Sequence, residues 1–249
     1  MTREFLYRRN AVLEALRSRR RACYALWLQE GLSKPEIAPL QELARQRGLD
    51  CREVSKARLG QLVGDPSHQG VALEVGSFPY VEPTEMLALA QARAELPFLL
   101  LLDLVQGPQN VGMLLRTAEA CGAHGVILQD RRAPDITPAM VAASAGATEH
   151  LLIAKVTNLV HTMRQLKQAD IWLIGLDLDT RAQPPEELDL AMAIGLVVGH
   201  EGSGLRRLVR EECDFLLRLP MRGQIASLNA AVAGSIALYT LWRARGLPQ

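Results

Sequence analysis

The sequence contains few cysteines, and none of them is placed to form a metal site. Cys23, Cys51, Cys121 and Cys213 lie far apart, and no two of them form a Cys-x-x-Cys pair. No histidine lies near them at the spacing of zinc ligands. We therefore expect buried, reduced thiols, with neither a disulfide nor a structural metal.

Long hydrophobic runs are also absent. No stretch approaches the roughly 18 uncharged residues that a membrane-spanning helix needs, and the first residues, MTREFLY, lack the apolar core of a signal peptide. Hydrophobic residues make up 49% of the chain and the formal net charge is +1, which is typical of a globular protein rather than a disordered one. These features predict a cytoplasmic protein with no membrane partner.

Charge is nearly balanced overall but uneven along the chain. Residues 1–76 hold 13 Lys and Arg against 9 Asp and Glu, an excess of +4, whereas residues 77–249 hold 15 against 18, a difference of −3. The arginines of the first segment are concentrated near its start: Arg3, Arg8, Arg9, Arg17, Arg19, Arg20 and Arg21. Such a cluster can neutralise nucleic-acid phosphates, although the charge count alone favours a solvated helix face.

The apolar pattern divides the chain into three parts. Residues 1–76 predict a small α/β unit, with helices over 10–20, 33–47 and 56–63 and strands over 23–29, 51–54 and 70–75. Residues 77–96 contain two prolines followed by a helix, so we interpret them as a linker.

Residues 97–249 show a repeated strand–helix alternation. Strands that are apolar on both faces are expected over 98–105, 125–129, 151–156, 171–176, 194–198 and 215–219. This pattern predicts an α/β domain around a buried parallel sheet. The last helix, expected over 228–245, begins with mostly small residues, so we expect another part of the backbone to pack closely against it.

The first candidate motif covers residues 106–122, QGPQNVGMLLRTAEACG. A buried strand ends in a Gly-Pro turn, and a helix begins near Asn110, at the end of a parallel sheet where ligands bind. Arg116 follows among apolar residues, where a charge is costly without a partner. Alone, Asn110 fits a helix N-cap equally well, and Arg116 fits a structural ion pair.

The second motif covers residues 196–205, LVVGHEGSGL, where a buried strand runs into a glycine-rich turn. Glycines let the backbone approach a ligand closely. A dinucleotide loop is excluded because Arg207 stands where the third glycine of G-x-G-x-x-G belongs. Glu201 is placed to bind a hydroxyl or an arginine, or simply to cap the next helix.

The third motif covers residues 219–229, LPMRGQIASLN, in which a strand leads into the small-residue helix. Ser227 and Asn229 stand at the helix entrance. Taken alone, they are ordinary capping residues.

Together, the three segments resemble the signature motifs of the SpoU (TrmH) family of RNA 2′-O-ribose methyltransferases, part of the SPOUT superfamily. The matching patterns are Asn110-x-Gly112-x-x-x-Arg116, Gly199-x-Glu201-Gly202-x-Gly204 and Ser227-Leu228-Asn229. Near the start, Tyr7 followed by NAVLEAL from Asn10, and the later HQG at residues 68–70, look like the amino-terminal RNA-binding domain of many members. That domain is similar to a ribosomal RNA-binding fold.

The resemblance implies domains at 1–76 (RNA binding) and 97–249 (catalytic), the latter with a trefoil-knotted parallel sheet. It implies S-adenosylmethionine as methyl donor, no metal, and a homodimer with the active site at the interface. The implied catalytic residues are Arg116, Asn110, Glu201, Ser227 and Asn229. The implied cofactor-binding residues are Gly199, Leu219, Leu228, Glu201, Gly202 and Met221. With RNA as partner, Arg8, Arg9, Arg19 and Arg20 become the candidate RNA-binding residues.

The segments AASAGATEH (142–150) and VTNL (156–159) resemble the subgroup that methylates a guanosine of 23S rRNA. The resemblance therefore implies this guanosine as the substrate. Arg8 departs from the pattern, because a glycine usually follows the first tyrosine; Gly107 and Ala230 replace a usual aspartate and a common valine. His200 and His68 are interpreted as incidental and structural. The alternatives are a transfer-RNA enzyme of the same family, an enzyme for an antibiotic-contacting ribosomal adenosine, and a catalytically inactive RNA-binding protein.

The chemistry implied is methyl transfer to a ribose 2′-hydroxyl, which needs its proton removed or its developing charge stabilised. A free guanidinium stays protonated, because its pKa is above about 12. We therefore expect Arg116 to orient the ribose or phosphate and to stabilise alkoxide charge, rather than to act as the base.

Overall fold

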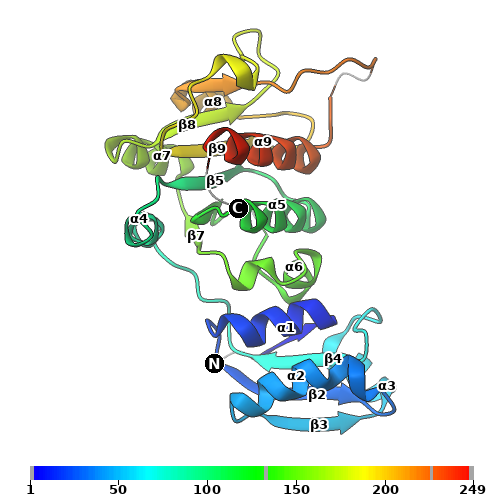
Figure 1. Cartoon of the computed structure of the whole chain (residues 1–249). Coiled ribbons are helices and arrows are strands. Elements are labelled where there is room, and N and C mark those ends of the chain that lie inside the picture. Colours follow the sequence, from blue (N-terminus) through cyan, green and yellow to red (C-terminus); the bar gives the residue numbers. More distant parts are fainter. Residues whose placement is uncertain (1–2, 132–133, 225–226, 247–249) are drawn as a thin grey trace. The chain divides into compact units, whose positions relative to one another are not determined.

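The structure is a computed structural model that describes residues 3–131, 134–224 and 227–246 (Figure 1). By its internal contacts the chain divides into two compact units. The first unit combines residues 1–79 with 135–150, and the second combines 80–134 with 151–249. The boundaries at residues 76 and 97 remain predictions, and the packing adds that residues 135–150 belong with the amino-terminal residues.

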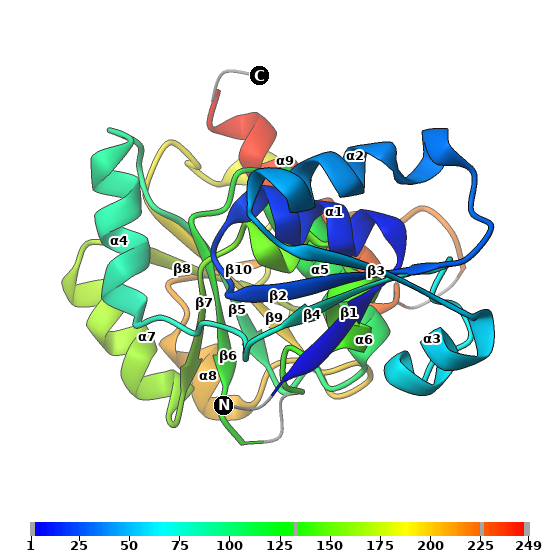
Figure 2. The ribbon, with the colours of Figure 1, turned by 90° about the horizontal axis from the view of Figure 1, so that it is seen from below.

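In its described part, the first unit holds a four-stranded mixed sheet in the order β1-β4-β2-β3. β4 is antiparallel to β1 and to β2, and β3 is parallel to β2. Helices α1 and α2 pack against each other, and α6 packs against α1 and β1 (Figure 2). The elements are β1 (Glu4–Tyr7), α1 (Arg9–Ser18), β2 (Cys23–Gln29), α2 (Lys34–Gln46), β3 (Asp50–Val54), α3 (Lys56–Val63), β4 (Val71–Val75), α6 (Pro138–Ala143) and the 3-10 turn η1 (Ala147–Glu149).

The backbone entering α1 is strained at Arg8. Its φ of 71° and ψ of 136° lie in a region that glycine adopts readily and other residues adopt at a cost. This explains why a glycine suits this position in the family pattern. Arg8 is the N-cap of α1, so Asn10, at which the sequence pattern predicts the helix to begin, lies inside the first turn.

A buried ion pair ties residues 135–150 to the rest of the first unit. The Arg21 side chain is fully buried, with Nε 3.5 Å from Glu149 Oε1 and Nη1 3.5 Å from Glu4 Oε2. Burial raises the pKa of Glu149. The guanidinium also lies 5.0 Å from the ring centroid of Phe78. Arg21 is therefore enclosed within the first unit and is not among the arginines that can meet a phosphate.

The described part of the second unit is built on a six-stranded parallel sheet, which the sequence predicted. The strand order, β10-β8-β9-β5-β6-β7, was not predicted. Every residue of β5, β6 and β9 is buried, because both faces of the sheet are covered by other elements. The elements are α4 (Pro83–Ala92), β5 (Phe98–Asp103), α5 (Pro108–Ala120), β6 (Gly125–Gln129), β7 (Ile153–Val156), α7 (Leu159–Gln168), β8 (Trp172–Leu176), η2 (Pro185–Glu187), β9 (Ile194–Gly199), α8 (Arg207–Glu212), β10 (Phe215–Leu217) and α9 (Ala230–Ala244).

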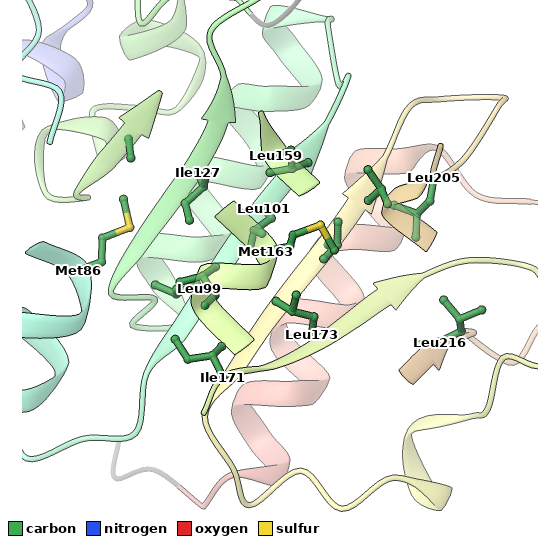
Figure 3. Packing of buried hydrophobic residues seen from close by; sticks show 14 of the residues in the cluster. Met86, Leu99, Leu101, Ile127, Leu159, Met163, Ile171, Leu173, Leu205 and Leu216 are labelled. Carbon is green, nitrogen blue, oxygen red and sulfur yellow. The ribbon is translucent and has the colours of Figure 1, made fainter. Parts of the chain in front are cut away.

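Side chains from α4, α7 and α8 form a hydrophobic core with one face of this sheet. Met86, Met163 and Val209 pack there with strand residues such as Leu101 and Leu173 (Figure 3). α5 and α9 pack side by side, and each also contacts the sheet (Figure 1).

The small residues of α9 allow the close packing that the sequence predicted. A Cβ atom added to Gly234 would lie 2.6 Å from Leu114 Cδ2 on α5 and 3.2 Å from Val198 Cγ2 on β9. Any larger residue here would push the helix away from both neighbours.

The cysteines are free thiols, and the expectation that all are buried holds fully only for Cys121: Cys23 and Cys213 are half-buried, and Cys51 is exposed at β3. Burial raises the pKa of Cys121 to about 11 and that of Cys213 to about 12. In the part of the chain that the structure describes, no helix is long and apolar enough to cross a membrane. Within the same residues, no group of three potential metal ligands comes together.

Candidate active site

A cavity of about 270 Å³ lies where β8 and β9 end, and we call it the motif cavity. This is the edge of a parallel sheet at which α/β proteins bind ligands. All six residues predicted to bind the cofactor lie on its wall, together with Ser227. The lining residues are Leu176, Asp177, Leu178, Val198, Gly199, His200, Glu201, Gly202, Ser203, Gly204, Arg210, Leu219, Met221, Ser227, Leu228, Ala230 and Ala233.

The glycine-rich loop folds back tightly on itself beside the cavity. The His200 amide donates to the Gly204 carbonyl oxygen (3.1 Å), and the Gly204 amide donates to the His200 carbonyl oxygen (2.9 Å). A Cβ atom at Gly199 would lie 2.5 Å from Gly204 O and 2.6 Å from the amide nitrogen of Leu205. Gly202 has a φ of +92°. The loop therefore needs glycine at position 199 for space and at position 202 for conformation.

Two carboxylates on strand ends hold the segment that follows this loop. Asp103 is fully buried and accepts hydrogen bonds from the amide (2.8 Å) and Nε (2.7 Å) of Arg206. Asp177 Oδ2 accepts from Nε of Arg210 at 2.8 Å. Since hydrogen bonds between charged partners are the stronger kind, both arginines fix the loop against the sheet.

The three sequence motifs meet through one carboxylate. Glu201 Oε2 accepts a hydrogen bond from Asn110 Nδ2 (2.8 Å), and Glu201 Oε1 accepts one from Asn229 Nδ2 (2.7 Å). The Asn229 amide nitrogen also lies 3.3 Å from Asn110 Oδ1. One residue from each motif thus takes part in a single polar network, although residues 110 and 229 are 119 positions apart in sequence.

The structure also shows which of the three network residues cap a helix. Asn229 is the N-cap of α9, because its Oδ1 accepts from the amides of Ala231 and Val232, while its Nδ2 serves the network. Asn110 is not a cap, since α5 begins at Pro108 after the N-cap Gly107. Glu201 caps no helix either, because the N-cap of α8 is Arg206.

Arg116 lies on the exposed side of α5, outside both the network and the cavity wall. The expectation that its charge sits in an apolar setting is wrong: Leu114 and Leu115 are buried, but Arg116 points away from them. Among the described residues it has no hydrogen-bond or ion-pair partner. Its guanidinium is therefore available to a ligand or a second chain.

The four candidate RNA-binding arginines fall into two pairs at opposite ends of α1. Arg8 donates to Ser67 Oγ from Nε (3.3 Å) and Nη2 (3.0 Å), and Arg9 Nη1 pairs with Glu36 Oε1 at 2.8 Å. Arg19 and Arg20 follow the last turn of the ten-residue helix, about 15 Å away at 1.5 Å per residue. One continuous patch of four arginines is therefore not formed.

Sequence reasoning missed Asp177 and Arg210, which bring opposite charges to the cavity wall. The available signal for Asp177 was its position directly after the expected strand 171–176. Arg210 had no such signal, because its role depends on α8 folding back beside the end of β8.

Comparison with known proteins identifies the family. The model of the SpoU rRNA Methylase family matches residues 97–239, and a model described as RNA 2′-O ribose methyltransferase substrate binding matches residues 5–81. The chain therefore belongs to the SpoU methylase family and is a methyltransferase of the SpoU/TrmH type.

Relatives and solved structures agree over nearly the whole chain. YacO of Bacillus subtilis, named as a TrmH family tRNA/rRNA methyltransferase, is 40% identical over 97% of this chain and 96% of its own. A similarly named protein of Staphylococcus saprophyticus is 36% identical over 95% and 94%. The SpoU methyltransferase AviRb from Streptomyces viridochromogenes superposes with a TM-score of 0.78 at 27% identity, covering 98% of this chain and 90% of that one. AviRb has also been solved in complex with AdoMet; that structure gives a TM-score of 0.79 at 24% identity.

Proposed function

We propose that this protein transfers a methyl group from S-adenosylmethionine to a ribose 2′-hydroxyl of RNA. The observation that carries the proposal is the Asn110–Glu201–Asn229 network beside the motif cavity. The network presents fixed hydrogen-bonding groups next to a cavity of small-molecule size, and binding and positioning a nucleotide substrate requires both.

The residues of the motif cavity fit S-adenosylmethionine. Leu178, Leu219 and Leu228 supply apolar surface, and the glycine-rich loop brings backbone amides and carbonyls to the wall. Asp177 and Arg210 add one group of each charge, which suits a molecule that carries an ammonium, a sulfonium and a carboxylate. When bound, the cofactor supplies an activated methyl group.

The network residues orient and polarise the ribose in this proposal. Transfer to the 2′-oxygen would break the bond between the methyl group and sulfur, and the hydroxyl proton would leave to a base or solvent. Arg116 stabilises the negative charge that develops on the oxygen. Glu201, held by two amides, keeps Asn110 and Asn229 in fixed orientations, and Ser227 offers a hydroxyl on the cavity wall.

A homodimer completes the site in this account. Exposed apolar side chains gather on the two neighbouring helices α5 and α9: Met113, Val232, Ile236 and Tyr239, each at least 42% exposed. An exposed apolar surface of this kind favours association, and burying it against a second copy would bring the unpartnered Arg116 to the interface. The knot implied by the family resemblance is likewise a proposal, supported by the close packing of Gly234 between α5 and β9.

The specific substrate in this proposal is a guanosine of 23S rRNA, which the enzyme methylates in the cytoplasm. The segments AASAGATEH and VTNL support this target. The second candidate is transfer RNA, which the name of YacO, a TrmH family tRNA/rRNA methyltransferase, keeps open.

The proposal is tested by incubating the protein with radiolabelled S-adenosylmethionine and total RNA from a strain that lacks this gene. The RNA is then separated by size, digested to nucleosides and analysed for 2′-O-methylated products. We expect label in 2′-O-methylguanosine of 23S rRNA, and a loss of activity on the order of 100-fold in Arg116→Ala.

The matched control is Arg207→Ala, which removes an equally charged, exposed arginine of the same unit that pairs with Glu211 and with no other described residue. It should retain wild-type activity. Label confined to transfer RNA would replace the substrate, label on a base would contradict ribose methylation, and no label on any RNA would favour the inactive RNA-binding protein.

A further inference from the structure

The first unit contains a cavity of its own at the amino-terminal end of α1. It measures about 560 Å³, within the range of ligand pockets. We call it the α1 hollow and define it by Arg9, Asn10, Gln29, Lys56, His68 and Gln69 on its wall. Among the described residues no carboxylate lines it, so an anionic ligand meets no direct repulsion there.

Two cations give the α1 hollow its charge. Arg9 is partly engaged, since its Nη1 pairs with Glu36 and its Nε donates to the Gln69 carbonyl oxygen (3.3 Å). Lys56 opens α3, is exposed, and has no hydrogen-bond or ion-pair partner in the described part of the chain. Lys56 is therefore the cation with most to gain from a phosphate.

A buried histidine adds a directed hydrogen-bond donor. His68 is only 3% exposed, and its Nδ1 accepts the amide hydrogen of Gly70 at 3.0 Å. The neutral ring therefore carries its proton on Nε2. This nitrogen has no partner within the described residues, and His68 lines the hollow, so Nε2 is a donor that a ligand there can use.

The start of α1 adds further donors. The amide of Arg9 is occupied by Gln69 Oε1 (3.0 Å), but the amides of Asn10 and Ala11 have no partner among the described residues. Unpaired amides at a helix start attract anions. The Asn10 side chain is exposed and equally unpartnered, so it can both donate to and accept from a base edge.

We propose that the α1 hollow is a subsite for one unpaired nucleotide of the RNA substrate, an inference that rests on the proposed function. Lys56 and the first-turn amides of α1 bind its phosphate, and Asn10 and His68 contact its base. The nucleotide must be unpaired, because a base inside an RNA helix hides the edge that these donors would reach. The subsite binds substrate at a place separate from the motif cavity.

The test measures binding of a fluorescein-labelled random 12-nucleotide RNA pool to the full chain by anisotropy, at several salt concentrations. Lys56→Gln should weaken binding about 3- to 10-fold and reduce the slope of log Kd against log salt by about 0.7 to 1. Asn10→Ala should weaken binding with little change in slope, since it removes no charge. The matched control, Arg58→Gln, removes an equal charge from the same helix outside the hollow and should change Kd less than twofold.

Two results would overturn the subsite. One is wild-type RNA affinity in both Lys56→Gln and Asn10→Ala. The other is binding of free nucleoside monophosphates as tightly as the RNA pool, which would make the hollow an effector site. Methyl transfer by the wild type is assayed in parallel: a protein that methylates RNA but binds it independently of the hollow refutes only the subsite, whereas hollow-dependent binding without methyl transfer refutes only the proposed function.

Discussion

The motif cavity and the α1 hollow differ in what forms their walls. The motif cavity is built from loop backbone, glycines and apolar side chains, with the Asp177–Arg210 ion pair in its wall. The α1 hollow is lined mainly by polar side chains, beside Leu32 and Pro66. Of the polar ones, Lys56 and Asn10 have no partner among the described residues. The first arrangement suits one small molecule of fixed shape. The second suits one unit of a charged polymer, which several polar side chains can contact at once.

Two buried histidines, His124 in the second unit and His68 in the first, also differ in how fully their ring nitrogens are hydrogen-bonded. In both His124 and His68, Nδ1 accepts a backbone amide hydrogen. Nε2 of His124 lies 3.0 Å from Glu95 Oε2, whereas no described residue pairs with Nε2 of His68. The first histidine is completed within its own unit, and the second is left with a donor for a ligand. The contacts of His124 therefore support a structural role, whereas the unpartnered Nε2 of His68 supports the proposed subsite.

The largest effect on ligand affinity is expected from a methyl group added where the backbone of the motif cavity is tightly packed. In Gly199→Ala the new methyl group collides with the backbone of residues 204 and 205. Overpacking of this kind costs about 1–3 kcal/mol, so S-adenosylmethionine affinity should fall on the order of 100-fold by calorimetry. Gly60→Ala, a helix glycine with open space around it, is the control and should leave the affinity unchanged. Wild-type affinity in Gly199→Ala would mean that the backbone does not shape the site.

The next effect is expected from the network. Glu201→Gln replaces one acceptor oxygen with an amide that faces another donor, so Asn110 or Asn229 loses its partner. Loss of a hydrogen bond to a charged group costs about 1.5 kcal/mol, and we expect kcat to fall about 10-fold. Cofactor affinity should change less than kcat. Glu119→Gln on the exposed side of α5 should be silent, and equal kcat values for the two variants would refute a positioning role.

A smaller effect distinguishes backbone strain from side-chain contact at Arg8. Arg8→Gly and Arg8→Ala both lose the hydrogen bonds to Ser67, but only glycine relaxes at a φ of 71°. We expect the glycine variant to be more stable than the alanine variant by about 1 kcal/mol in urea unfolding. Equal stability would show that the surroundings, and not the residue, absorb the strain.

The smallest effect is a pH dependence from His124. Burial lowers the pKa of His124 in the folded protein. In the unfolded chain a histidine has its ordinary pKa of about 6.5, so the unfolded chain binds the proton more readily. Stability is therefore present above pH 6.5 and lost as the pH falls below it, by at most about 1 kcal/mol at pH 5.5. Neighbouring Glu95 opposes the shift, and Arg93 and Arg245 add to it. Urea unfolding at pH 7.5 and 5.5 measures how the free energy of unfolding depends on pH. This dependence should be weaker in His124→Gln and unchanged in the exposed-site control His161→Gln.

Much of the fold could be predicted from periodicity. The strands 23–29 and 125–129 and the helix 56–63 have the observed bounds, because each is a clear apolar pattern between turn residues. β1 was not predicted, since four residues carry too little pattern. The packing of residues 135–150 with the first unit could not be predicted either, because it depends on contacts such as Arg21 with Glu149 between distant segments.

The residues of the polar network were among the predicted site residues, but the geometry that joins them was not predicted. The motif positions place Asn110, Glu201 and Asn229 near the same sheet edge, yet the sequence does not tell that one carboxylate joins the two amides. The exposure of Arg116 was misjudged, because local sequence shows its apolar neighbours but not which side of α5 faces the sheet. Relations between distant segments are what the structure adds.

The separation of the two binding sites is tested most directly by one set of titrations. Wild type, Gly199→Ala and the double variant Asn10→Ala/Lys56→Gln are each titrated with S-adenosylmethionine and with the 12-nucleotide RNA pool, after circular dichroism confirms folding. We predict that Gly199→Ala loses cofactor affinity and keeps RNA affinity, and that the double variant does the opposite. Loss of both ligands in either folded variant, or unchanged RNA affinity in the double variant, would contradict the account.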